Sequence, residues 1–135
     1  MSALPGDDPL AVALVDAICS GDLATLRRLL TEHPDLATVS VTGGDGLGRT
    51  ALHVATDWPG YFPNGPAVVE ALLAAGADSS APLVGGINQE TPLHWAASSD
   101  DDDVAAALIA GGADIEAPGA SIAGGGPLDD AVGYG

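Results

Sequence analysis

Apolar residues recur three or four positions apart in three separate stretches of this 135-residue chain. The stretches contain Leu26, Leu29 and Leu30; Val68, Val69, Leu72 and Leu73; and Val104, Leu108 and Ile109. This spacing places the apolar side chains on one face of an α-helix. An alanine-rich stretch precedes each of the later two, so the pattern predicts helices in pairs. The expected helices span residues 9–19, 22–32, 50–57, 66–75, 91–98, 102–111 and 127–133.

Two short markers repeat along the chain in a constant order. The first reads Thr91-Pro92-Leu93-His94-Trp95-Ala96-Ala97, with related copies at residues 50–56 and 126–132 and a fainter one at 13–18. The second, Gly-Ala-Asp, follows a leucine-rich pair at residues 76–78 and 112–114, and in degraded form at 33–35. Two markers that recur in the same order indicate internal structural repeats.

The residue types at the two markers suit helix ends. Thr50 and Thr91 stand where a hydroxyl can cap exposed backbone N–H groups at a helix start. Pro92 lies in the first turn, where its missing N–H costs nothing. Gly76 and Gly112 lie where a left-handed residue would end the outer helix of each pair.

Together the markers resemble the T-P-L-H-x-A signature of ankyrin repeats, over residues 13–135, and their wording resembles that of bacterial members of the family. The resemblance implies an all-α solenoid, an array of helix-turn-helix units joined by β-hairpin-like fingers. It implies a single domain over residues 1–135, with units near 9–45, 46–86 and 87–121 and a partial unit at 122–135. Because the last unit lacks its outer helix, three alternatives stay open: the fourth inner helix frays, which is the expectation, it packs against another copy of the chain, or the natural chain continues past Gly135.

The resemblance also assigns a role to His53 and His94, which occupy the same place in successive units. In the family this histidine forms hydrogen bonds with the threonine of its own motif and with nearby loop backbone, which hold the finger in place. The alternative is a metal or acid–base site. True zinc sites bring together three or four ligands, and this spacing resembles none of them, so no metal ligand is predicted. Trp95 is expected to pack in the core between units.

An inserted loop and an acidic run are the candidate partner-binding surface. The second unit carries five extra residues within 57–66, and the insertion contains Trp58, Tyr61 and Phe62. Aromatic rings of this kind often dominate binding interfaces. Regular stacking would place them beside Asp100 and Asp101. The alternatives are that the rings fold back over the alanine-rich helices, and that Asp102 or Asp103 of the run caps the next helix.

Charge and cysteine content limit which classes of partner and which cellular compartment are expected. The formal net charge is −16, lysine is absent, and the cations are Arg27, Arg28 and Arg49. Such a chain repels nucleic acids and anionic membranes, so neither is an expected partner. A partner chosen by charge would be basic, although the acidity also fits simple solubility. The acidic N-terminus does not resemble a signal peptide, and the single cysteine, Cys19, suits a reducing compartment, so the cytoplasm is expected.

These observations favour a protein–protein interaction scaffold with no catalytic activity and no cofactor. No set of nucleophile, base and acid is recognisable, because the titratable residues fall at repeat-equivalent or capping positions. The alternative is a structural segment of a longer repeat protein whose C-terminal units carry the function. We expect a monomer, with association through the unfinished C-terminal end as the alternative.

Overall fold

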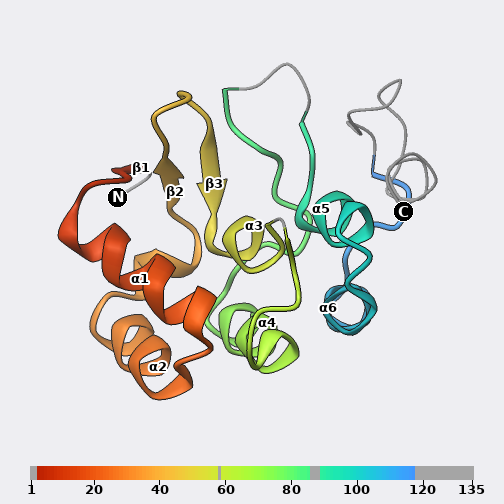
Figure 1. Ribbon diagram of the computed structural model, residues 1–135, viewed down its shortest axis with the longest axis horizontal. Coiled ribbons are helices and arrows are strands. Elements are labelled where there is room, and N and C mark those ends of the chain that lie inside the picture. Colours follow the sequence, from red (N-terminus) through yellow and green to blue (C-terminus); the bar gives the residue numbers. More distant parts are fainter. Residues whose placement is uncertain (1–2, 58, 86–88, 118–135) are drawn as a thin grey trace.

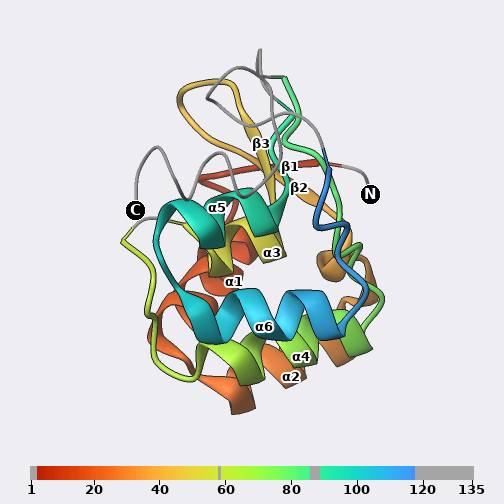
Figure 2. The same ribbon diagram turned by 90° about the vertical axis from the view of Figure 1, so that its right-hand side faces the viewer.

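Three helix pairs form two rows in the computed structural model, which describes residues 3–57, 59–85 and 89–117. The inner row consists of α1 (Pro9–Ser20), α3 (Ala51–Ala55) and α5 (Pro92–Ser98). The outer row consists of α2 (Leu23–Glu32), α4 (Gly65–Ala74) and α6 (Asp102–Ala110) (Figure 1). The segments that join the units project from the other side of the inner row, which is seen clearly from the side (Figure 2).

Six of the seven expected helices are confirmed, and each begins and ends within two residues of its predicted bounds. The seventh, over residues 127–133, lies outside the described residues. Thr50 and Thr91 are the N-cap residues of α3 and α5, as expected. Gly76 and Gly112 both have positive φ angles just beyond α4 and α6, which confirms the predicted helix ends. A short 3-10 helix, η1 (Pro34–Ala37), was not predicted.

The strictly all-α fold class is wrong, because a three-stranded sheet is present. β2 (Ser40–Thr42) and β3 (Gly48–Thr50) form an antiparallel hairpin, which is the first finger. β1 (Ala3–Pro5) adds to β2 in parallel. An exposed hairpin edge offers unpaired backbone groups to any nearby strand, and the N-terminal segment takes that place. The sequence did not indicate β1, which is short and ends in a proline, a residue that edge strands tolerate.

The second finger continues the sheet on its other side. Gly48 N–H donates to the carbonyl of Val84 at 2.8 Å, and Val84 N–H donates back to Gly48 at 3.0 Å. In the three-stranded part, Leu4 lies opposite Val41 and Val41 lies opposite Arg49. Directly opposed residues project from the same face of a sheet, so these three side chains lie in one row.

The core runs through the array between the two rows of helices. Its largest fully buried side chains include residues from every unit: Leu14, Ile18, Leu26, Leu36, Leu52, Val68, Val69, Leu72 and Leu108. Most of the apolar positions that predicted the outer helices are therefore buried, although Ile109 is exposed. Each unit buries its apolar face against the next one, as in other stacked repeats. Within the described residues, no helix is both long enough and apolar enough to cross a bilayer.

Candidate partner-binding surface

His53 fastens the second finger to the inner row. Its Nδ1 accepts the Thr50 N–H at 3.2 Å and lies 2.9 Å from the Thr50 hydroxyl oxygen. Its Nε2 lies 2.8 Å from the carbonyl oxygen of Glu90, at the base of the second finger. A carbonyl oxygen can only accept, so Nε2 carries the proton and the ring is the neutral tautomer. These are the hydrogen bonds that the family resemblance implied.

Burial keeps His53 neutral. The side chain is fully buried, and this desolvation lowers its pKa to about 4. The hydrogen bond to Glu90 acts in the opposite direction, whereas the positive charge of Arg49 lowers the pKa further. His94 is equally buried, and its Nδ1 accepts the Thr91 N–H at 2.9 Å. His53 therefore links two units, and His94 repeats the local hydrogen bond to the threonine of its own motif.

Trp95 is half-buried rather than enclosed in the core. Its ring meets the His53 ring edge-on, with centroids 4.9 Å apart and an interplanar angle of 70°. On the finger side, the Arg49 guanidinium lies 5.7 Å from the Trp95 ring centroid. Arg49 also pairs with Asp45 at 2.8 Å, and this hydrogen bond is the main reason that the pKa of Asp45 falls to about 2. Trp95 therefore packs between two units, as expected, although its side chain stays half-buried.

The loop between α3 and α4 is fastened to both neighbouring units. Asn64 donates its side-chain N–H to the carbonyl of Gly21 at 2.9 Å. Tyr61 N–H donates to Asp101 Oδ2 at 2.8 Å, and the Tyr61 hydroxyl donates to the carbonyl of Asp100. Tyr61, Asn64 and Asp100 all have positive φ angles of 56° to 57°, which are unfavourable for residues with side chains. Contacts on both sides hold this backbone in place.

The acidic run divides into one buried and three exposed carboxylates. Asp101 is only 2% exposed and is the N-cap of α6, where it accepts the Val104 N–H. The prediction that Asp102 or Asp103 caps the helix is therefore wrong. Both lie exposed in the first turn, where their charge favours the positive end of the helix. Because Asp101 is enclosed, a partner could reach only the other members of the run, including Asp100.

Replacing Asp101 with alanine is expected to lower the free energy of unfolding by about 2 kcal/mol. The variant leaves the N–H groups of Val104 and Tyr61 without their carboxylate. Asp102→Ala, one residue further on, is the matched control and should change stability by less than about 0.5 kcal/mol. Urea unfolding of both variants measures the difference, and equal losses would show that Asp101 has no special role.

Phe62 lines an open cavity between the first finger and the inner row. The cavity has a volume of about 330 Å³. We call this hollow the finger cavity. It is lined by Val15 and Cys19 from α1, Val41, Gly43 and Arg49 from the finger, Val54 and Asp57 from α3 and its end, and Phe62 from the loop. Two repeat units and the insertion thus contribute to one hollow. Most of its side chains are apolar.

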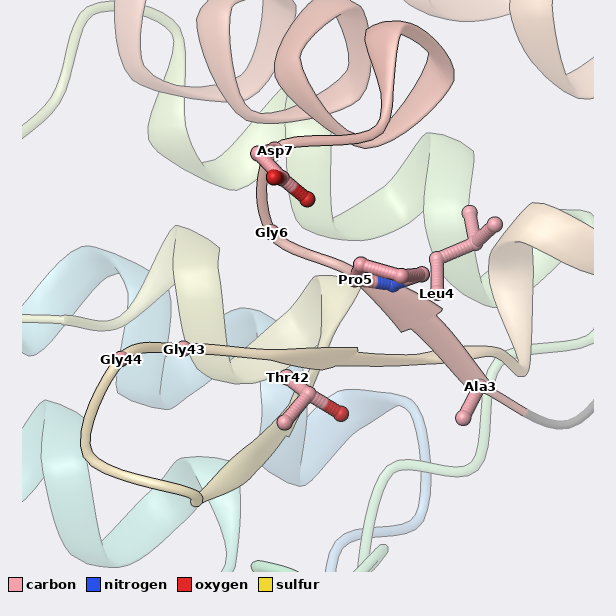
Figure 3. A pocket seen from close by; sticks show the side chains of 8 residues that line it. All are labelled: Ala3, Leu4, Pro5, Gly6, Asp7, Thr42, Gly43 and Gly44. Carbon is pink, nitrogen blue, oxygen red and sulfur yellow. The ribbon is translucent and has the colours of Figure 1, made fainter.

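A larger hollow lies where the N-terminal segment meets the first finger, and it offers fewer chemical groups. It measures about 870 Å³ and is lined by residues 3–7 and 42–44 (Figure 3). Three of these eight residues are glycines, and only Asp7 and Thr42 have polar side chains. Such a shallow, largely backbone surface provides few groups that could select one partner over another. The finger cavity is therefore the better candidate site.

The structure brings together only part of the predicted surface. Tyr61 and Asp100 meet at the outer edge of the array, while Phe62 lies in the finger cavity. Trp58 lies outside the described residues. Val15, Val41 and Val54 were missed, since nothing in their spacing shows that they line a hollow. Asp57 was noticed only as the start of the insertion. Among the described residues, no group of three or more His, Cys, Asp or Glu side chains could hold a metal ion.

Stacked helix pairs with projecting fingers define a helical repeat protein. The sequence model of the family described as ankyrin repeats (three copies) matches residues 14–119 of the chain. The chain therefore belongs to the ankyrin-repeat family, whose members are generally protein–protein interaction modules and typically lack catalytic activity. A comparison with curated proteins found no match.

Proposed function

We propose that this domain is a non-catalytic scaffold that binds a partner protein through the finger cavity and the loop beside it. The observation that carries the proposal is the cavity itself, which four separate segments form without any bound partner. A preformed site loses little conformational entropy when a partner docks. Phe62 supplies a large apolar side chain of the kind that contributes strongly to binding.

The outer edge of the loop extends this surface. Tyr61 is 63% exposed and lies against Asp100, next to the exposed carboxylates of Asp102 and Asp103. In our proposal, a partner that fills the finger cavity also reaches this edge, where Trp58 belongs to the same inserted loop. Asp101 takes no part in contact with the partner. Its role is to hold Tyr61 in place.

Net charge supports a basic partner. With 19 acidic residues against three arginines, the domain attracts positively charged proteins and repels nucleic acids and anionic membranes. Exposed charges are screened over ~8–10 Å at moderate ionic strength, so added salt should weaken the complex. We further propose a monomeric domain in the cytoplasm, where the single cysteine would stay reduced.

The proposal is tested with a partner captured from the source cells and then purified. Phe62→Ser should weaken binding by about tenfold or more, and Tyr61→Ser should weaken it less. Ile115→Ser is the control, because Ile115 is 58% exposed but lies in the turn after α6. Binding is measured by calorimetry at a temperature where each variant is fully folded. An unchanged affinity in Phe62→Ser, or an equal loss in Ile115→Ser, would place the interface elsewhere.

A further inference from the structure

The finger cavity combines apolar walls with charged groups. Val15, Val54 and Phe62 come from three different segments and line the same hollow. Two charged side chains, Arg49 and Asp57, share its wall. A purely apolar side chain that entered would displace water from these charged groups and would offer them no polar contact in its place, which is costly. A short polar side chain would leave the apolar walls uncovered.

The charge balance of the cavity favours a cation. Arg49 is the positive group of the wall, and Asp45 pairs with it at 2.8 Å. Asp57 adds a negative charge that acts on both Arg49 and Cys19, and the exposed Asp16 on α1 adds another that acts on Cys19. The surroundings of the cavity therefore carry net negative charge. An acidic side chain would be repelled there.

We propose that the finger cavity receives a lysine or arginine side chain of the partner. Its aliphatic stem packs against Val15, Val54 and Phe62, and its charged end lies next to Asp57. Basic side chains commonly bury their methylene groups while the charged head keeps a polar partner. The inference rests on the proposed function, because it names the group that enters the site already described.

Cys19 provides a reporter for occupancy of the cavity. It is the only cysteine of the chain, it lines the cavity, and it is half-buried. Burial, and then the charges of Asp57 and Asp16, raise the pKa of its thiol, so alkylation needs a mildly alkaline solution. A side chain that fills the cavity should slow this alkylation. A peptide that binds elsewhere on the domain should leave its rate unchanged.

The test uses random peptides displayed on phage and selected against the immobilised domain. The tightest peptide that protects Cys19 is resynthesised with each basic residue replaced in turn by norleucine, which keeps the stem and removes the charge. Because the net charge of −16 attracts any basic peptide, affinity alone does not show that a basic side chain enters the cavity. The decisive quantity is the coupling between one peptide residue and Asp57, measured with a double-mutant cycle.

One basic residue of the peptide should couple to Asp57. Its norleucine form and the Asp57→Asn domain should each bind roughly tenfold more weakly, and the two changes together should cost little more than either alone. Glu70→Gln removes the same charge from the outer helix α4 and is the control. It should lower the affinity of every peptide slightly and by the same factor. Melting temperatures of the variants serve as the folding control.

Two outcomes overturn the inference alone, and a third overturns the proposed function as well. If a protecting peptide binds as well with norleucine at every basic position, the cavity selects an apolar side chain, and only the inference fails. The same holds if Asp57→Asn and Glu70→Gln have equal effects. If no selected peptide protects Cys19, the finger cavity is not a binding site, and both proposals fail.

Discussion

Replacing Gly21 with alanine is expected to lower the free energy of unfolding by about 3 kcal/mol or more. Gly21 lies between α1 and α2 with a φ angle of +69°, a region that disfavours residues with a side chain. A Cβ atom there would lie 2.2 Å from the carbonyl oxygen of Pro63, in the inserted loop. The obstacle is backbone, so it cannot move aside without shifting the loop. Urea unfolding measures the loss.

Substitutions at two other glycines separate the cost of backbone strain from the cost of the clash with Pro63. Gly76→Ala meets the same kind of backbone strain, with φ at +103°, but no atom lies within 4 Å of its new Cβ. It should cost about 1 kcal/mol. Gly44→Ala has neither strain nor a nearby atom and should be almost neutral. If Gly21→Ala is no worse than Gly76→Ala, the loop is not packed against the α1–α2 turn as the structure shows.

The stability of the domain is expected to fall by about 3 kcal/mol between pH 6.5 and pH 4 because of His53 alone. Its pKa is about 4 in the folded protein and near 6.5 when unfolded. In this window the unfolded chain takes up a proton that the folded chain excludes, so the contribution is complete above pH 6.5 and is lost on acidification. Burial is the main cause that opposes protonation of His53 in the fold, and the positive charge of Arg49 adds to it.

The His53→Gln variant separates the pH dependence caused by His53 from that caused by carboxylates, whose protonation also destabilises the fold in acid. Glutamine has a side-chain N–H that could replace Nε2 at Glu90, but it does not titrate. We expect the variant to be less stable than wild type at pH 7 and to have a smaller difference between pH 7 and pH 4.5. Urea unfolding at both values gives the comparison. The same pH dependence in both proteins would show that His53 titrates normally.

Short-range features of this fold are readable from the sequence because their partners lie a few residues apart. The Thr50–His53 pair is one turn of helix long, and Thr91–His94 repeats it. Helix ends follow the same logic, since capping residues and glycines act on the turn next to them. The repeat markers then extend this local information over three units, which is why the predicted helices match the observed ones.

Several long-range features could not be predicted in this way. Asp101 caps α6 and also binds Tyr61, 40 residues earlier, so its neighbours Asp102 and Asp103 looked equally suitable. Phe62 and Tyr61 are adjacent in sequence, yet one lines the finger cavity and the other lies at the outer edge. The turn of the loop separates them, and that turn depends on contacts with Gly21 and Asp101.

The sequence by itself thus determined the repeat family, the helix pairs and the local hydrogen bonds of each unit. Only the tertiary structure decided that β1 extends the sheet, that Asp101 is buried, and that α1, the first finger, α3 and the inserted loop line one open cavity. The physical reason is the range of the interactions. Propensity, capping and periodicity act within about a turn of helix, whereas these contacts join segments that meet only when the units stack.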